Sequence, residues 1–486
     1  MENVNNTGIT KTKRPIRAVQ FGEGNFLRAF VDYMIDILNE KTDFNGSIAI
    51  VKPIPHGDLD RFREQDCIYT VYLRGLDKGE EKIIKRVVTS VDSVYGCSED
   101  YKEYSDLAKL DTLRFVISNT TEAGIVYNEN DKFDSCPPET YPGKLTKFLY
   151  ERYKYFGGDC EKGLVILPVE LIDDNGKNLK KCVKSFISLW KLEDAFSDWI
   201  DKACVFTSTL VDRIVTGFPR DEADDIYKGF GYEDKLLVTG EPFALWVIES
   251  DKDISGELPF DKAGLPVIFT NDHKPYKQRK VRILNGAHTS FVLASFLAGN
   301  DYVGQSMDDK DIYDFMYKTI FDEVIPTLDL PKSDLVDFAN SVIDRFRNPF
   351  IKHALLSISL NSVSKWRARC MPSLTKYMET THRVPNHLAF SLAALIAFYN
   401  GSEIRDGVLI GHRDGEEYEI RDDNSVIDFF AANSGRSTDD LTHEVLSNKA
   451  FWGEDLSERP GLEPVVGMML EMIRTEGMRN AVRKVS

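Results

Sequence analysis

A cluster of basic residues lies in the second half of an acidic chain. Five Lys and Arg side chains and no acid occur among the nine residues from Lys274 to Arg282, although the 486-residue chain has a net charge of −17. A charge run usually forms a solvated surface, but residues 283–291, which follow, mix apolar side chains with hydrogen-bonding groups. This pattern favours a partly buried site in which cations surround polar side chains.

Lys280, Asn285 and His288 could together transfer a proton to a carbonyl oxygen. Asn285 and His288 are three residues apart and share a face if this segment is helical, and the long Lys280 stem could reach the same pocket. Ketone reduction needs a proton donor within hydrogen-bond reach of the oxygen, and burial beside cations lowers the pKa of a lysine toward that role. Asn285 could donate to the developing alkoxide. We therefore predict that all three are catalytic; the alternatives are a solvated lysine and a hydrogen-bonded core histidine.

A glycine turn near the N-terminus predicts a dinucleotide site. Residues 17–21 are predicted to form a buried strand and residues 26–39 an amphipathic helix, with Gly22, Gly24 and Asn25, a suitable N-cap, between them. Glycines let the backbone approach a pyrophosphate, whose charge the helix N-terminus favours. Leu27 occupies the third glycine position of the GxGxxG fingerprint, so the motif is incomplete, and a plain tight turn is the alternative.

The end of the second predicted strand, residues 47–51, leaves the cofactor's identity open. A carboxylate at this position would bind the ribose hydroxyl of NAD, but Lys52 and Pro53 stand there instead. Lys52 could meet the ribose phosphate of NADP or be solvated. The sequence predicts no metal site, because the seven cysteines are widely spaced without a CxxC pair and no histidine pair has convincing ligand spacing.

The elements around these motifs predict two domains and an α/β fold. Further strands are predicted at 68–73, 86–94, 114–119 and 164–169, and helices at 101–110, 143–155 and 176–190. Strands that alternate with helices indicate a doubly wound, largely parallel sheet. From about residue 277 long helical patterns dominate, including 311–324, 333–345, 349–369 and 386–398, with a short hairpin at 401–423 that has Asp-Gly at its turn. We place the domains at residues 1–275 and 276–486.

Composition excludes several classes of function. The acidic balance argues against nucleic-acid binding, which needs a basic face. No apolar run is long enough for a membrane span, and the polar N-terminus lacks a signal-peptide core. We expect a cytoplasmic protein that acts on a small molecule, as a monomer or a small homo-oligomer.

Several motifs together resemble the polyol-specific long-chain dehydrogenases, the family that includes mannitol dehydrogenase. The Lys-x4-Asn-x2-His pattern at Lys280 follows a Gly-x-Gly-x-Phe-x-Arg-Ala motif that begins at Gly22. Residues 118–124 (SNTTEAG), 210–215 (LVDRIV) and 345–349 (RFRNP) also match, so the likeness covers nearly the whole chain. Within the family, these strings are most similar to the enzymes that reduce a keto-uronate.

The resemblance implies a Rossmann-type N-terminal domain, a mostly α-helical C-terminal domain and an active site between them. It implies metal-independent interconversion of D-tagaturonate and D-altronate with NAD(H), with NADP left open, and with Lys280 as general acid/base assisted by Asn285 and His288. The residues expected to bind the cofactor are Gly22, Glu23, Gly24, Asn25, Phe26, Lys52, Thr121, Glu122 and Gly124. Asp212 and Lys365 match positions that the family uses around the substrate, and Arg213, Arg347, Lys365 and Arg367 are candidates to bind its carboxylate.

Two positions depart from the polyol enzymes. Leu171 stands where they carry an asparagine of the oxyanion site, which shifts that role toward Asn285, and Ser357 replaces an arginine eight residues before Lys365. The alternatives are a sister enzyme, either fructuronate reductase or a mannitol or mannitol-phosphate dehydrogenase, and a non-catalytic dinucleotide-binding sensor. A sensor would be expected to lack Lys280, Asn285 or His288, and all three are present.

Overall fold

The computed structural model describes residues 1–57, 59–121 and 123–486. The chain divides into two compact units, one made of Met1–Gly75 and Glu81–His273 and the other of Leu76–Glu80 and Lys274–Ser486.

A six-stranded parallel sheet forms the centre of the first unit. Its order is β5-β2-β1-β6-β7-β8, which in sequence order of these six strands is 3-2-1-4-5-6. This is the doubly wound Rossmann order, and it confirms the expected α/β fold. The strands are β1 (Ile16–Phe21), β2 (Ser47–Lys52), β5 (Val91–Gly96), β6 (Phe115–Ser118), β7 (Val165–Pro168) and β8 (Val205–Phe206).

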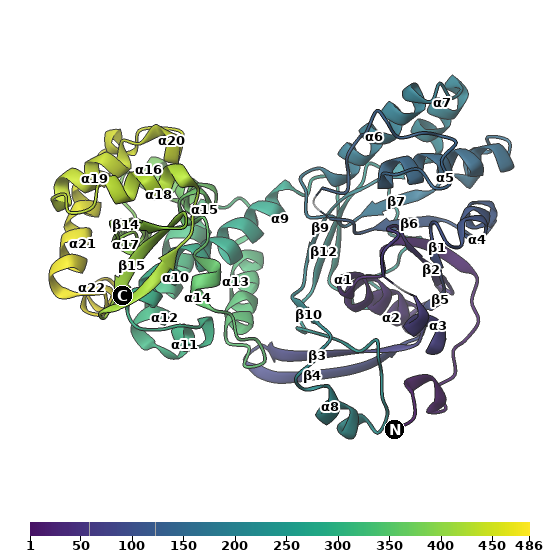
Figure 1. The fold of residues 1–486 in the computed structure, drawn as a ribbon, viewed down its shortest axis with the longest axis horizontal. Helices are drawn as coiled ribbons and strands as arrows, with labels where there is room; N and C mark the ends of the chain where they lie inside the picture. Colours follow the sequence, from purple (N-terminus) through teal and green to yellow (C-terminus); the bar gives the residue numbers. More distant parts are fainter. Residues whose placement is uncertain (58, 122) are drawn as a thin grey trace. The chain divides into compact units, whose positions relative to one another are not determined.

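Both faces of this sheet are buried, which explains why its strands are almost continuously apolar. Ala18, Ile50 and Ile117 point into one hydrophobic core, and Val19 and Val116 into another on the opposite face. Helices of the second core cover one face of the sheet, with α2 on the other (Figure 1). The helices of this unit are α1 (Asn25–Leu27), α2 (Tyr33–Lys41), α3 (Asp60–Glu64), α4 (Tyr101–Asp106), α5 (Tyr141–Tyr155), α6 (Asn175–Leu189), α7 (Asp194–Ala203) and α8 (Ala223–Phe230).

Two smaller sheets complete the first unit, and one of them corrects a predicted strand. Residues 86–94 do not form a single strand: β4 (Glu80–Val88) belongs to a four-stranded sheet, and β5 returns to the parallel sheet after a break at Thr89 and Ser90. The Ser90 side chain is buried and donates to the Asp32 carbonyl, which holds the chain at this break. The other strands are β3 (Tyr69–Asp77), β9 (Ser208–Asp212), β10 (Val215–Gly217), β11 (Val238–Gly240), β12 (Leu245–Glu249) and β13 (Val267–Thr270).

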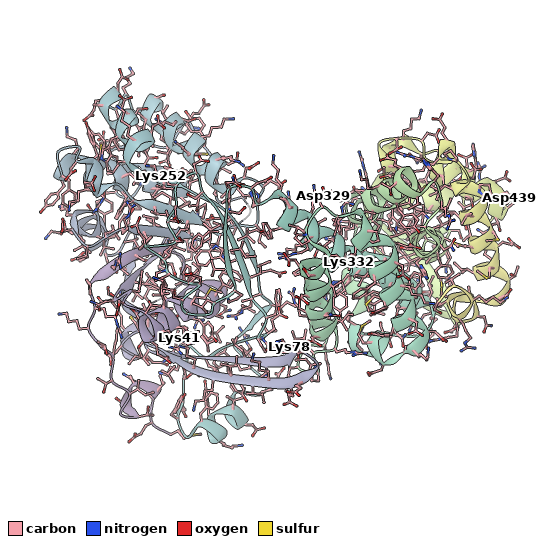
Figure 2. The ribbon with its side chains drawn as sticks, turned by 180° about the vertical axis from the view of Figure 1, so that it is seen from behind. Lys41, Lys78, Lys252, Asp329, Lys332 and Asp439 are labelled. Atoms are coloured by element: carbon pink, nitrogen blue, oxygen red, sulfur yellow. The ribbon has the colours of Figure 1, made fainter. Side chains whose placement is uncertain are left out.

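The second unit is built around two almost wholly buried helices, α10 (Gly286–Leu297) and α17 (Asn386–Phe398). These helices are apolar on every side, as expected for the centre of a helical domain. Around them lie α9 (Lys274–Arg279), α11 (Val303–Asp308), α12 (Lys310–Lys318), α13 (Lys332–Phe346), α14 (Leu355–Ile358), α15 (Ser362–Arg369), α16 (Met371–Thr381), α18 (Asn424–Ala432), α19 (Thr438–Leu446), α20 (Lys449–Trp452), α21 (Leu462–Glu476) and α22 (Met478–Val485). In Figure 2, Asp439 lies in the first turn of α19, beyond its N-cap Ser437.

Local chemistry accounts for two further features of this unit. The long helix predicted at 349–369 is wrong: α14 and α15 are separate, and Asn361, in the left-handed conformation at a φ of 53°, breaks the helix between them. The predicted hairpin is present as β15 (Val408–Arg413) and β16 (Glu416–Ile420), and β14 (Glu403–Arg405) adds a third antiparallel strand. Both turns are Asp-Gly pairs with positive φ, the geometry that tight hairpins prefer.

Over the described ranges, the helices are all too short or too polar to traverse a bilayer. Within the same residues no three His, Cys, Asp or Glu side chains are grouped in a way that could hold a metal ion.

Candidate active site

Gly22 lies where the strand order of the parallel sheet reverses. It follows β1, and its amide donates to the Val51 carbonyl of β2 at 2.9 Å. Its φ of 126° disfavours any other residue, and a Cβ atom would lie 3.0 Å from Leu27 Cδ1 and 3.3 Å from the Asn119 carbonyl oxygen, which follows β6. The crevice between the carboxyl ends of β1 and β6 is the position at which such sheets bind nucleotides, so the turn fits a dinucleotide.

Gly24 begins the helical segment that runs from Asn25 to Lys41. Gly24 is the N-cap, which differs from the expected N-cap Asn25, and apart from its chain neighbours no atom of the described residues lies within 4 Å of where its Cβ would be. The backbone here is therefore open to a phosphate, which a helix N-terminus favours. Lys41, labelled in Figure 2, ends the segment and donates to the Ala263 carbonyl.

A turn of π-helix at Arg28–Asp32 interrupts this segment and is held by two buried arginines. Arg28 donates to Asn25 Oδ1 at 2.5 Å and also to the Leu236 carbonyl. The Asn25 side chain is thereby directed to Arg28 and packs against Gly217, where a Cβ would lie 2.7 Å from Asn25 Nδ2. Asn25 therefore links the start of this helix to Arg28 and Gly217. Phe26 stacks on Phe30, with ring centroids 4.9 Å apart.

The loop after β6 carries the other expected cofactor residues. Thr121 is exposed, and its carbonyl accepts from the Gly124 amide at 2.7 Å. A Cβ on Gly124 would lie 2.0 Å from Thr120 Oγ1, so this tight loop requires glycine. The expected cofactor residue Glu122 lies outside the described residues. Glu23 is half-buried within the glycine turn.

Lys52 does not present a free ammonium group at the end of β2. Its side chain is only 3% exposed, and Nζ donates to the Gly57 carbonyl at 2.6 Å and to Glu99 Oε1 at 3.1 Å. This differs from the expectation that Lys52 is solvated or meets a ribose phosphate. Glu99, which the sequence did not single out, comes from the loop after β5.

In the second unit, a turn of π-helix at Lys280–Asn285 joins α9 to α10. A π-turn closes hydrogen bonds between residues five apart, so it brings such residues toward one face of the helix. Lys280 and Asn285 are five apart, and Asn285 and His288 are three apart in the α-helical register that follows. We therefore expect the wider turn to bring the three predicted catalytic residues closer to one face than a regular α-helix would.

Gly286 fixes this helix against the end of α15. A Cβ on Gly286 would lie 3.3 Å from the Arg369 carbonyl oxygen, and Cys370 Sγ lies 3.5 Å from the Gly286 carbonyl oxygen. Arg369 also donates to Thr289 Oγ1 at 3.3 Å. This close approach brings the cations of α15 beside His288.

His288 is a neutral side chain in a cationic setting. Its ring stacks on Phe346 with centroids 4.1 Å apart and meets the His353 ring edge-on at 5.4 Å. Burial, followed by His353, Arg345, Arg369 and Lys365, lowers its pKa well below the usual value. Its Nε2 atom is buried and has no hydrogen-bond partner among the residues of the described ranges. A polar atom in this state is suited to meet a substrate hydroxyl or carbonyl.

The cations around His288 are only partly those expected. Lys365 is among them, half-buried, with Nζ donating to the Ile358 carbonyl at 2.9 Å. Arg369 lies one helical turn further along the same face of α15, whereas Arg367 is exposed and lies against Gly453. Arg345 is buried, but Arg347 is exposed with its guanidinium carbon 4.6 Å above the Tyr313 ring. The arginines beside His288 are therefore Arg345 and Arg369, each two residues from a predicted carboxylate-binding arginine, and the roles of Arg347 and Arg367 stay predictions.

Asp212 and Arg213 lie in the first unit, at the end of β9, and both are buried. The Arg213 guanidinium donates to the carbonyls of Phe243, Ala29 and Pro242 at 3.0, 2.6 and 3.2 Å. Ala29 belongs to the π-turn of the glycine-turn helix, where displaced carbonyls need donors. Arg213 is thus committed to the backbone, which contradicts its expected role in binding a substrate carboxylate.

The positions that depart from the polyol enzymes are both open to solvent. Leu171, after β7, is 63% exposed. Its neighbour Glu170 is buried, and Oε1 accepts from the amide and hydroxyl of Thr120 at 3.0 and 3.1 Å. Ser357 is exposed and donates to the Ala354 carbonyl at 2.7 Å. Neither Leu171 nor Ser357 brings the polar group that the polyol enzymes carry there.

Two family models together match most of the chain. Residues 16–262 match the mannitol dehydrogenase Rossmann domain, and residues 272–473 match the mannitol dehydrogenase C-terminal domain. The chain belongs to the mannitol dehydrogenase family.

Relatives similar over their full length share one activity name. Proteins from Klebsiella pneumoniae, Shigella flexneri and Yersinia enterocolitica, each named altronate oxidoreductase, are 46%, 45% and 44% identical to this family member. The first two comparisons cover 99% of both chains, and the third covers 100% of both.

Two solved structures have the same fold. A D-sorbitol dehydrogenase in substrate-free form superimposes with a TM-score of 0.79 at 22% identity, covering 96% of this chain and 95% of that one. A Pseudomonas fluorescens mannitol 2-dehydrogenase in ternary complex with NAD and D-mannitol superimposes with a TM-score of 0.66 at 22% identity, covering 98% and 95%.

We predict that Arg213→Ala destabilises the first unit. The substitution leaves three carbonyls without their donor, and buried unpaired groups cost about 1–3 kcal/mol each. Chemical denaturation should show a loss of about 3 kcal/mol or more. Arg220→Ala, at an exposed position, is the control and should change stability little. Equal stability of the two variants would contradict the backbone role of Arg213.

We predict that His288 makes the protein less stable as the pH falls below about 6.5. Because the folded state holds His288 neutral at a lowered pKa, the unfolded state binds the proton first. The stability advantage of the wild type over His288→Gln should therefore shrink below that pH, by at most about 1.4 kcal/mol per pH unit. Denaturation from pH 7 to 5 measures this difference, with exposed His412→Gln as control. Parallel curves for the wild type and His288→Gln would rule the effect out.

Proposed function

We propose that this protein is an altronate oxidoreductase that interconverts D-altronate and D-tagaturonate with NAD(H). The observation that carries the proposal is the helix of the second unit, on which Lys280, Asn285 and a neutral His288 follow one another through a π-turn, with cations beside His288. Relatives with this activity name, 44–46% identical over nearly the whole chain, support the same substrate. The chemistry is that of a dehydrogenase of this family.

The first unit supplies the features that would hold the dinucleotide. Gly22 and Gly24 would admit the pyrophosphate to the backbone, since a side chain at Gly22 would meet the neighbouring loop and, among the described residues, the space over Gly24 is open. Thr121 and Gly124 lie on the loop after β6, which starts at Asn119 beside Gly22. When bound, the nicotinamide would supply a hydride to the keto carbon of tagaturonate.

Lys280 delivers the accompanying proton to the keto oxygen and takes it back when altronate is oxidised. Arg279 and Arg282 flank it in the sequence, so the proton donor lies in a basic segment. Burial lowers the pKa of the Arg282 guanidinium, which donates to Ser373 at 3.0 Å, so this cation is held in place inside the unit. Asn285 donates to the oxygen as its charge develops, the role of an oxyanion-site amide.

His288 and its cations bind the rest of the substrate. The neutral ring offers Nε2 to a hydroxyl or to the reacting oxygen, without adding another positive charge. Lys365 and Arg369 donate to the neutral groups Ile358 carbonyl and Thr289 hydroxyl, so they can still attract an anion. A uronate carboxylate supplies the charge that complements them. This requirement distinguishes a uronate from a neutral polyol.

We predict that Lys280→Ala lowers kcat by about 10²–10⁴, the usual contribution of a general acid/base. Binding of NADH, followed by its fluorescence, should stay close to the wild-type value. Lys274→Ala removes an exposed lysine from the same basic run and should retain kcat. Near-normal turnover of Lys280→Ala would remove the lysine from the mechanism.

We predict that Arg369→Gln raises KM for tagaturonate by about tenfold or more, because a hydrogen bond to a charged group contributes about 1.5–3 kcal/mol. Arg367→Gln is a matched control on the same helix, since its exposed side chain turns to the opposite face. Steady-state kinetics with tagaturonate measures both variants. The same KM in both would show that Arg369 does not bind the carboxylate.

A further inference from the structure

A carboxylate lies beside the end of β2, although the end of the strand itself has none. The chain continues from β2 through Lys52 and Pro53, but Glu99 reaches across from the loop after the neighbouring strand β5. Its Oε1 atom lies 3.1 Å from the buried Lys52 Nζ, while the Glu99 side chain is 49% exposed. Lys52 is thus the buried partner of this ion pair, and Glu99 is the partner that faces solvent.

Hydrogen bonds on both sides of Glu99 fix the conformation of the loop that carries it. The Cys97 amide donates to the Lys52 carbonyl at 3.0 Å, which extends the pairing of β2 and β5. The Asp100 carboxylate accepts from the Gly96 amide at 2.8 Å and from Arg63 at 2.9 Å. These contacts hold the loop on both sides of Glu99.

Gly96 allows the Glu99 carboxylate to fold back over the strand end. A Cβ on Gly96 would lie 2.2 Å from Glu99 Oε2, so any other residue would displace the carboxylate. The Glu99 amide, followed by Lys52, lowers the pKa of the Glu99 carboxyl, which is therefore charged at neutral pH. This loop presents a fixed negative charge at the carboxyl edge of the sheet.

In sheets of this order the adenosine ribose lies at the end of the second strand. A carboxylate there binds the ribose hydroxyls of NAD, and a cation accommodates the 2′-phosphate of NADP. Two cations at this edge are already paired with carboxylates: Lys52 with Glu99, and Arg63 with Asp60 and Asp100. The charge balance of this edge favours a hydroxyl over a phosphate.

We propose that Glu99, held by Lys52, binds the adenosine ribose of the cofactor and selects NAD(H) over NADP(H). One carboxylate oxygen stays with Lys52 and the other accepts from the ribose hydroxyls, whereas a 2′-phosphate at this position meets a like charge. The proposal rests on the dinucleotide site proposed above and names the residue that determines its specificity. Lys52 is then a positioning residue and not a ligand.

The test uses the full-length protein and two probes that lack nicotinamide, ADP-ribose and its 2′-phosphate, with binding measured by calorimetry. The wild type should prefer ADP-ribose, and Glu99→Gln should reduce this preference by about tenfold or more. Glu103→Gln is the matched control, because Glu103 is an exposed acid in the adjoining α4. Glu99→Lys should shift the preference toward the 2′-phosphate, a gain that a misfolded variant would not show.

The outcomes separate the two proposals. A wild type that binds ADP-ribose, with the same preference in Glu99→Gln as in Glu103→Gln, would overturn the role of Glu99 alone. A wild type that prefers the 2′-phosphate would also overturn it. A wild type that binds neither probe would remove the dinucleotide site itself, and the role of Glu99 with it.

Discussion

The second unit depends on the close approach of two backbones at Gly286. Because this residue has no side chain, the end of α15 can lie against the start of α10. The Cys370 thiol donates to the Gly286 carbonyl across this contact. Lys365 and Arg369 then stand beside His288 and not in solvent. The approach thus places two of the cations that, after burial and His353, keep His288 neutral.

Both units contain a turn of π-helix next to their predicted functional residues. In each, a turn of π-helix interrupts the helix that bears the functional residues, at Arg28–Asp32 in the first unit and at Lys280–Asn285 in the second. A π-turn displaces backbone groups and shifts side chains relative to a regular helix. In the first unit Arg28 and Arg213 satisfy carbonyl and amide groups around the displaced turn. Arg28 and Arg213, which the sequence alone could assign to ligand binding, therefore form hydrogen bonds that stabilise this geometry.

Much of the fold could be predicted because its signals are local. The strand at Ile16–Phe21, the glycines after it and the buried helix at 386–398 carry their pattern in consecutive residues. The π-turns could not be predicted, because one wider turn changes the register without altering the apolar periodicity. The sequence did not single out Arg345 and Arg369, which lie beside His288, because a shift of two residues reverses the face of a helix. Glu99 was missed because the carboxylate beside Lys52 comes from another strand, which no linear motif reveals.

The contact between Gly22 and Asn119 also constrains how the chain assembles. The first strand made is a central strand of the sheet, and its second neighbour β6 follows only after β2, β3, β4 and β5. Parallel pairing between distant segments forms slowly, because loop closure must precede the contacts that reward it. During synthesis, the glycine turn would therefore emerge long before the loop that completes its crevice. Until β6 is available, one edge of β1 is exposed, and this is the interval in which the nascent chain is most vulnerable to misassembly.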